Sequence, residues 1–433
     1  MWLVRYISIS LIFVSMCFAS TEKTLRTGVE LGIIATGSGS TIHSPEGWAT
    51  NGSTGVSIAT NIVKSGNYSI HLNATSGVAC EATVRSDSVV FWPQVSSNDG
   101  RKDTKLGMWF YFVSAPSAKR TILALGSSGS GRGTALKLRT DMKLEYYNGA
   151  TLYRTSTATL PMGQWTWIGV DTYLGKTAAG TAGFKIFVDN VAEQWDTTGI
   201  NYGITVNDED VSYFSAGDAS ATAGTFDMYI DDVQINVGVS CDYPSNTTAL
   251  AYMFPIADSA ISTWTASGGG TSNLFSNVDN IPYTYTTESS SNTIVNANAS
   301  GVQKITFSLT KPQDAGIVGI HTIMDVSYHV RYSSHTSAAA QTLRLNPSYN
   351  ASTNVNVDKV TSASAHGNDN ATTHGNWRTA IFINQVGITK ANWIDSISPS
   401  ITVEKLTATS TQMCVSAVWA IVEYLQSSNS ETD

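Results

Sequence analysis

Short apolar segments separated by turns rich in glycine, serine and asparagine recur along almost the whole chain. Leu106–Val113 is nearly all apolar and aromatic, and Asn148–Gly149 has the composition of a tight hairpin turn. Between Leu160 and Gln194 two such segments are joined by a small-residue loop, with Trp165 and Trp167 on one face of the first segment. Many short segments of this kind, with almost no helical periodicity, predict an all-β fold.

The length of 433 residues allows two domains. A first series of predicted strands ends with Phe226–Val237, and a second β-rich region begins at Tyr252. We therefore predict two tandem β-sandwiches. The expected boundaries are residues 26–238 for the first sandwich, 239–250 for a linker, 251–427 for the second sandwich and 428–433 for a tail.

Residues 1–19 have the pattern of a secretory signal peptide, with Arg5 before an apolar run from Tyr6 to Phe18 and small residues near Ala19. An uncleaved N-terminal anchor is the alternative. The apolar run is short for a bilayer, so the mature chain is expected to have no membrane span. A cleaved signal predicts a secreted or surface-displayed protein.

Charge and cysteine content narrow the possible partners. Charged residues make up 13% of the chain, against about 25% in an average globular protein. The net charge of -8 argues against a nucleic-acid partner, which needs a basic surface. Cleavage of the leader would remove Cys17 and leave Cys80, Cys241 and Cys414, which allow one disulfide at most. Whether Cys80 pairs with Cys241 or with Cys414 stays open.

The order of several motifs resembles that of concanavalin A-like lectin and laminin-G-like jelly rolls. These motifs are GMWFYF, the Trp165–Trp167 strand, GFKIFVDNV and the closing MYIDDVQINV. The resemblance implies that residues 26–238 form a jelly roll that binds carbohydrate. The region from Tyr252 to Tyr424 resembles the β-rich modules that follow such domains in structural proteins of phages and environmental viruses.

Three acidic residues are candidates for a metal site. In the closing segment, Asp231 alternates with Tyr229, Val233 and Ile235, so it is expected on the apolar face that points into the core. A buried carboxylate is costly unless it is paired or bound to a metal. Glu30 in the opening segment is a plausible neighbour, and together with Asp231 and Asp232 it would suit Ca²⁺. The resemblance also implies a structural calcium. The alternative is that Asp231 caps loop amides or pairs with an arginine.

Catalytic motifs are missing from the sequence. There is no strand with paired carboxylates of the kind that glycosidases need and no Gly-x-Ser-x-Gly elbow. Trp109 and Trp167 are expected in the core, whereas Trp195, Tyr146 and Tyr147 are the candidates for surface aromatics that stack on sugars.

We therefore expect a non-enzymatic structural or adhesive protein of a virion or cell surface that binds glycans or self-assembles. The first alternative is a secreted polysaccharide-active enzyme, a glycosidase or lyase on the same fold. The second alternative is a purely structural shell or fibre protein without affinity for glycans.

Overall fold

A computed structural model of the chain consists almost entirely of β-strands, as predicted. It describes residues 23–32, 34, 46–50, 53–85, 89–90, 103–127, 131–148, 150–173, 183–193, 213–220, 223–238, 246–261, 264–266, 270–279, 294–296, 303–317, 322–334, 342–348, 357–360, 378–383, 397–406 and 413–425. The leader at residues 1–19, the tail at 428–433 and most of the linker lie outside these residues. Among the described residues, no helix has the length and apolar character needed to cross a membrane.

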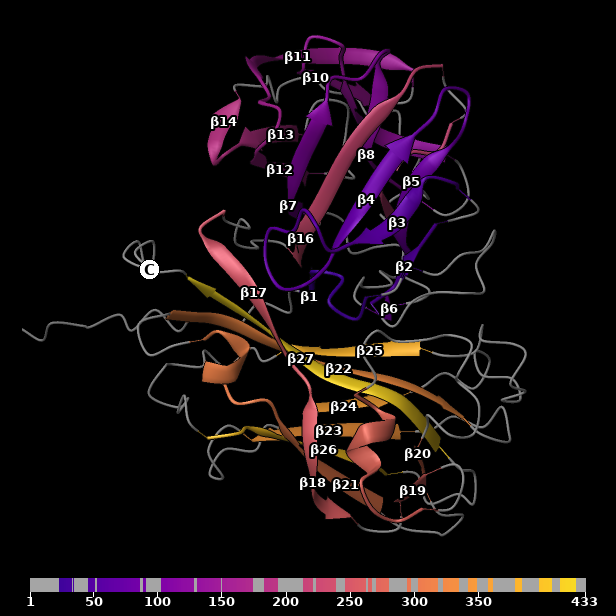
Figure 1. Ribbon diagram of the computed structural model, residues 1–433, viewed down its shortest axis with the longest axis vertical. Coiled ribbons are helices and arrows are strands. Elements are labelled where there is room, and N and C mark those ends of the chain that lie inside the picture. Colours follow the sequence, from indigo (N-terminus) through magenta and orange to yellow (C-terminus); the bar gives the residue numbers. More distant parts are fainter. Residues whose placement is uncertain are drawn as a thin grey trace, which may run out of the picture.

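The N-terminal half of the chain forms two antiparallel sheets packed face to face (Figure 1). Sheet A has the order β14-β13-β12-β7-β16-β4-β3, and β1 also pairs with β16. Its strands are β1 Lys23–Thr27, β3 Val56–Ala59, β4 Ser69–Ala74, β7 Asp103–Ser114, β12 Trp165–Tyr173, β13 Gly183–Val188, β14 Val191–Glu193 and β16 Phe226–Gly238. The predicted hairpin within Leu160–Gln194 is confirmed, because β12 pairs antiparallel with β13.

Sheet B closes the first sandwich, with the order β11-β10-β9-β8-β15-β5-β2. Its strands are β2 Trp48–Ala49, β5 Cys80–Arg85, β8 Arg120–Ser127, β9 Gly131–Leu138, β10 Lys143–Asn148, β11 Thr151–Thr159 and β15 Tyr213–Asp218. Alternate residues of both sheets meet in one core, in which Phe110, Ile168 and Ile230 of sheet A are fully buried with Leu144 and Phe214 of sheet B. This alternation leaves the residues between them on the outer faces.

The C-terminal half forms a second pair of sheets. Sheet C has the order β19-β20-β27-β22-β25-β6 with β17 also on β27, and sheet D has the order β18-β21-β26-β23-β24. The strands of sheet C are β6 Val89–Val90, β17 Thr248–Met253, β19 Trp264–Ala266, β20 Ile294–Asn296, β22 Thr322–Ser334, β25 Arg378–Ile383 and β27 Met413–Leu425. Those of sheet D are β18 Pro255–Ile261, β21 Gln303–Leu309, β23 Thr342–Ser348, β24 Val357–Val360 and β26 Ser400–Lys405; short 3-10 helices span η1 Leu274–Asn277 and η3 Gln313–Ala315.

Two features connect the halves of the chain beyond simple succession. Strand β17 begins at Thr248, inside the range predicted as linker, and pairs with β27 along its whole length. Strand β6, which precedes β7 in the sequence, adds parallel to β25 of sheet C. A two-residue strand from the first half of the chain thus extends a sheet of the second sandwich.

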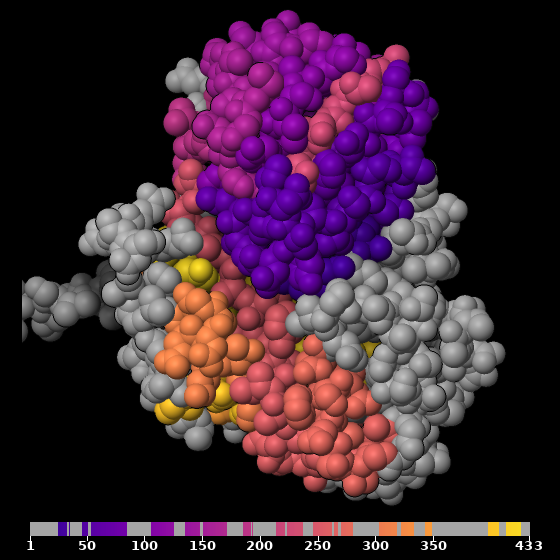
Figure 2. Space-filling model, in the orientation of Figure 1, coloured from indigo at the N-terminus to yellow at the C-terminus, as the bar shows by residue number. Residues whose placement is uncertain are grey.

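The outer face of sheet C is covered by the first sandwich, which lies directly above it in Figures 1 and 2. Leu31 packs against Leu250, Tyr252 and Trp419 in an apolar cluster. This contact explains why β27 is buried along almost its whole length: one face lies in the core of the second sandwich and the other faces the first. Continuous burial of this kind is what its loosely alternating sequence indicates.

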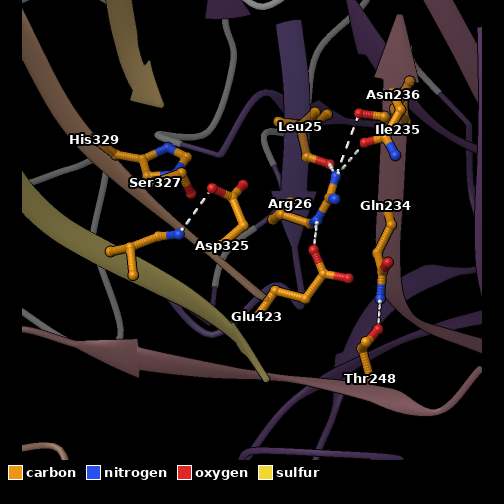
Figure 3. A network of polar contacts seen from close by, with 11 residues as sticks. Leu25, Arg26, Gln234, Ile235, Asn236, Thr248, Asp325, Ser327, His329 and Glu423 are labelled. Carbon is orange, nitrogen blue, oxygen red and sulfur yellow. Dashed lines mark hydrogen bonds and ion pairs between the residues drawn. The ribbon is translucent and has the colours of Figure 1, made fainter. Parts of the chain in front are cut away.

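Polar contacts fix the same interface (Figure 3). The Arg26 Nε donates to the Glu423 carboxylate at 2.7 Å, and its Nη1 donates to the Asn236 side chain at 2.9 Å. The Gln234 amide donates to the Thr248 hydroxyl at 3.0 Å. These groups are buried, so a cation and a carboxylate from the two sandwiches compensate each other away from water.

Cys80 and Cys414 are both buried, and neither forms a disulfide in this structure. Cys80 lies in the core of the first sandwich and Cys414 in β27 of the second. A Cys80–Cys414 disulfide, one of the two open pairings, is therefore not formed. Cys241 lies outside the described residues.

Candidate functional site

A row of aromatic side chains crosses four neighbouring strands on the outer face of sheet A. Trp165 of β12 is the direct cross-strand partner of Tyr111 of β7, Tyr111 is the partner of Tyr229 of β16, and Tyr229 is the partner of His71 of β4. Ring centroids are 5.6 Å apart for Trp165 and Tyr111, 6.1 Å for Tyr111 and Tyr229, and 4.2 Å for the parallel stack of Tyr229 on His71. We call these four residues the aromatic row.

The aromatic row follows from period-two alternation. On β7, Phe110 and Phe112 point into the core, so Tyr111 between them must point outward. Trp165, Tyr111 and His71 are half-buried and Tyr229 is buried at 6% exposure. The row extends over roughly 14 Å, three strand-to-strand intervals of about 4.8 Å. A short oligosaccharide spans a similar length.

At the β4 end of the row, a histidine is paired with a carboxylate. The His71 Nε2 lies 2.7 Å from the Asp227 Oδ1, and both side chains are partly exposed, at 22% and 31%. The second ring nitrogen of His71 is not engaged by Asp227. A carboxylate that holds one imidazole nitrogen orients the ring and leaves the other nitrogen to accept or donate a proton.

A second aromatic pair lies two residues along the strands from the row. Trp109 and Trp167 are cross-strand partners with ring centroids 5.5 Å apart. The Trp167 ring lies on Gly107, where a Cβ would come within 2.1 Å of it. Both tryptophans are buried, as expected, but on the outer face rather than in the core, and neither indole N–H has a hydrogen-bond acceptor. The exposed Lys64 places its Nζ 4.2 Å from the Trp109 ring centroid.

The three residues predicted to bind a metal do come together. Glu30 follows β1 in a turn, and its charge adds to the forces that raise the pKa of Asp231. Burial raises the pKa of Glu30 to about 8, with further contributions from the Glu46 and Asp232 carboxylates. Burial also raises the pKa of Asp232 to about 7, and it raises that of Asp231 together with the adjacent Asp232 charge. We call Glu30, Asp231 and Asp232 the acidic cluster.

Asp231 reaches the acidic cluster from the outer face of β16 and not from the predicted core-facing side. The pairing of β16 with β7 shifts between Asp231 and Gln234, and Asp232 has a positive φ of 45°. This bulge puts Tyr229 and Asp231 on the outer face and Val233 on the core face, so the prediction that Asp231 shares a core-facing side with Val233 is wrong. Asp231 is nevertheless fully buried.

The carboxylates of the acidic cluster mostly accept hydrogen bonds from one loop. The Asp231 Oδ2 accepts from the Lys64 amide at 2.8 Å, and Glu30 accepts from the Asn67 and Tyr68 amides at 2.8 and 3.2 Å. This is the amide capping that the sequence left as an alternative. Each Glu30 oxygen keeps a further lone pair for a cation, whereas the Asp231 Oδ2 also accepts from the Ser65 amide at 3.4 Å. Among the described residues, no three His, Cys, Asp or Glu side chains are grouped to hold a metal by themselves, so backbone carbonyls or water would have to complete a calcium shell.

The tyrosines predicted to stack on sugars are not on the surface. Tyr146 is fully buried in the core of the first sandwich, whereas its neighbours Glu145 and Tyr147 on β10 face outward. Tyr147 does face outward but is 7% exposed, and its ring is covered by the ammonium groups of Lys119 and Lys137 at 5.1 and 4.1 Å. Both predictions are therefore wrong in this arrangement. Trp195 lies outside the described residues.

The aromatic row itself is missing from the sequence-based candidates. The available signal was the alternation of Trp109 with Tyr111 and of Trp165 with Trp167, which puts each pair on one face of its strand. The contribution of His71 and Tyr229 depends on strand order, because β4 and β16 are far apart in the sequence.

No protein-family model matches the chain, and no curated protein matches it. Among solved structures, a Trypanosoma rangeli sialidase with a covalent intermediate is 14% identical, with 42% of this chain and 27% of the sialidase covered and a TM-score of 0.30. The alginate lyase AlgAT5 of polysaccharide lyase family 7 is 9% identical over 39% of this chain and 78% of its own, with a TM-score of 0.28. A PL-14 alginate lyase from Aplysia kurodai is 14% identical over 42% of this chain and 86% of its own, with a TM-score of 0.27.

These similarities are too weak to assign a family or an activity, and the chain spans less than a third of the sialidase. They do correct the expectation that the chain is not an enzyme, because the neighbours are glycan-active enzymes by name. That expectation rested on the lack of known catalytic motifs in the sequence. Such motifs do not detect a pair of residues that come from distant strands, such as His71 and Asp227. None of these three neighbours is a viral structural protein, so the virion role stays a prediction.

Proposed function

We propose that this chain is a polysaccharide-active protein that binds a glycan chain along the outer face of sheet A. The observation that carries the proposal is the alignment of Trp165, Tyr111, Tyr229 and His71 in one line across four strands. Rigid aromatic rings at regular spacing offer apolar faces to the C–H surfaces of successive sugars at low entropic cost. Sheet strands hold these rings more precisely than loops would.

The His71–Asp227 pair favours an enzyme over a lectin on the same surface. Sugar stacking needs neither a histidine nor a carboxylate, yet this pair lies at one end of the row and is open to solvent. Proton transfer by a positioned side chain is a general catalytic device, and histidine is its most frequent carrier.

Affinity electrophoresis of the purified chain in gels that contain soluble polysaccharides tests the binding surface. We expect at least one polymer to retard the protein, and Tyr111→Ala and Trp165→Ala to weaken the retardation. Tyr153→Ala is the matched control, because Tyr153 is a half-buried tyrosine on sheet B, away from the row. Equal retardation of all variants would show that the row does not bind sugars.

We also propose a structural Ca²⁺ at the acidic cluster. The supporting observation is that Glu30, Asp231 and Asp232 are buried together with raised pKa values, a repulsion that a divalent cation would relieve. Calcium would hold the loop that carries Lys64 against β16. Secretion through the N-terminal leader and self-association of the chain remain predictions from the sequence.

A further inference from the structure

At one end of the aromatic row, the His71 imidazole and the Tyr229 phenol lie close enough together to contact the same sugar. Both groups can take part in proton transfer. His71 is stacked in parallel on Tyr229, with ring centroids 4.2 Å apart, and Asp227 orients the imidazole from the side. An imidazole held by a carboxylate can accept a proton, and a phenol can donate one. A base and an acid are therefore adjacent on the surface where the glycan would lie.

A cation lies on the same face, two residues along the strands from the aromatic row. Trp109 and Tyr111 are alternate residues of β7, roughly 7 Å apart along the strand, and Lys64 carries its ammonium group over Trp109. The Lys64 side chain is exposed, whereas its backbone amide is fixed by Asp231. The ammonium group is thus positioned by the fold and accessible to an anionic group on a sugar bound to the row.

The nearby carboxylates do not fit glycoside hydrolysis. Hydrolysis needs two carboxyl groups on opposite sides of the glycosidic bond, about 5 to 9 Å apart. Asp227 is engaged by His71, and Asp231 and Asp232, the next acidic residues on β16, are buried beneath the loop at Lys64 and Ser65. A histidine, a phenol and an ammonium group suit a different way of breaking the chain.

We propose that this face cleaves an acidic polysaccharide, a polymer of uronate sugars, by β-elimination; this rests on the proposed glycan-binding function. His71 removes the proton from carbon 5 of the uronate, and the electron pair left behind forms the C4=C5 double bond. The bond from carbon 4 to the bridging oxygen breaks, and that oxygen leaves with the bonding pair and takes a proton from the Tyr229 hydroxyl. Lys64 pairs with the carboxylate of a neighbouring uronate and so holds the polymer on this face.

The products are an unsaturated uronate on one fragment and an intact sugar end on the other. The proton that His71 has taken and the proton that Tyr229 has lost exchange with solvent, so no oxidant, reductant or other reactant is consumed. The reaction therefore has a signature that hydrolysis lacks, which is ultraviolet absorbance of a double bond conjugated with a carboxylate.

The test uses the full chain with a panel of soluble polyuronates and, for each polymer, its carboxyl-reduced neutral form. Ultraviolet absorbance, reducing ends and retardation in affinity electrophoresis are measured in parallel. We expect retardation and rising absorbance with at least one polyuronate and no cleavage of its neutral form. His71→Asn and Tyr229→Phe should each lower the initial rate about 100-fold or more, because each removes one proton-transfer group.

Two further variants separate the roles. Tyr229→Phe keeps the ring, so it should retain binding while it loses the rate, and Tyr153→Phe on sheet B should keep both. Lys64→Gln should raise KM for the polyuronate by about tenfold.

Four results would overturn the inference. Retardation by polyuronates without any new absorbance would leave the binding function standing and reject elimination. Reducing ends without absorbance would show hydrolysis instead. Full activity of Tyr229→Phe would reject its role as the acid. No retardation by any polymer, charged or neutral, would reject the proposed binding function as well.

Discussion

Two outward sheet faces of this protein carry the same pair of side chains, a histidine stacked on an aromatic ring. On sheet A, His71 lies on Tyr229 with centroids 4.2 Å apart, and on sheet C, His329 lies on Trp419 with centroids 4.9 Å apart. His71 is partly exposed and paired with Asp227. His329 is buried, and its Nε2 bonds to the Ser327 hydroxyl at 2.9 Å.

The difference comes from what covers each face. The first sandwich packs on sheet C, and burial lowers the pKa of His329 to about 3, so this ring is neutral and serves packing. The aromatic row of sheet A keeps part of its surface in contact with solvent. The same local motif is thus an interface element on one sheet and a candidate ligand surface on the other.

The largest expected loss of stability comes from breaking the contact between the first sandwich and sheet C. Glu423→Ala leaves the buried Arg26 guanidinium without its carboxylate, and we expect it to lower the free energy of unfolding by about 3–5 kcal/mol. Urea unfolding followed by tryptophan fluorescence measures the loss. Asp141→Ala is the control, because its pair with Arg139 is exposed and should contribute less than about 1 kcal/mol. A loss below about 1 kcal/mol for Glu423→Ala would mean that this contact does not hold the interface.

The second prediction concerns the pH dependence of the covered histidine. The pKa of His329 is lowered, so its stabilising contribution is complete above about pH 6.5 and is lost as the pH falls toward 3. Relative to the parent chain, His329→Gln should therefore gain about 3 kcal/mol between pH 6.5 and 4.5. The two chains are compared by urea unfolding at each pH.

Asp325 supplies an opposite control on the same face. Burial raises its pKa to about 6, so its contribution is present at low pH and is lost as the pH rises through about 6. Asp325→Asn should therefore gain stability relative to the parent as the pH rises from 5 to 7. Parallel pH slopes for the parent, His329→Gln and Asp325→Asn would mean that neither group is buried as described.

A smaller effect is expected on the open face. Tyr111→Ala should weaken the affinity for a retarding polysaccharide about tenfold, which corresponds to about 1.4 kcal/mol. Trp419→Phe on the covered face should not change this affinity, because the first sandwich shields that ring. Isothermal titration with an oligosaccharide measures both values. An equal loss of affinity in the two variants would show that the aromatic row is not the binding surface.

The smallest effect is expected at the acidic cluster, which is formed by the turn after β1 and by β16. The raised pKa values of Glu30 and Asp232 mean that their protonated forms stabilise the fold, a contribution lost as the pH rises through about 7 to 8. Added Ca²⁺ should therefore raise Tm by a few degrees near pH 8.5 and less near pH 6, and EDTA should reverse the rise. Glu30→Gln should remove the calcium response. An unchanged Tm with calcium at both pH values would show that no ion binds there.

Much of the fold was predictable from local pattern. The alternation in β7 and β12, the hairpin to β13 and the continuous apolar run of β27 each specify a strand and its buried faces within about ten residues. The proximity of Glu30 to Asp231 was also predictable, from the tendency of first and last strands of a jelly roll to pair, as β1 and β16 do.

The candidate site was less accessible to such reasoning. The bulge at Asp232 reverses which side of β16 faces the core, and no local signal in the sequence marked that one-residue shift. Tyr146 and Tyr147 beside a turn were taken as exposed, but one enters the core and the other lies under two lysines. Turn proximity indicates the end of a strand and does not reveal which residues of distant strands cover its side chains.

The sequence by itself determined that this protein is built of β-strands and which residues alternate along each strand, because both depend on neighbours in the chain. Only the tertiary structure decided which outward face stays open. His71, Tyr111, Trp165 and Tyr229 form one row because β4, β7, β12 and β16 are neighbours in sheet A. His329 is withdrawn from solvent because a second sandwich docks on sheet C through Arg26 and Glu423. Strand order and the docking of the sandwiches depend on contacts between residues hundreds of positions apart. Alternation within one strand gives no information about such contacts.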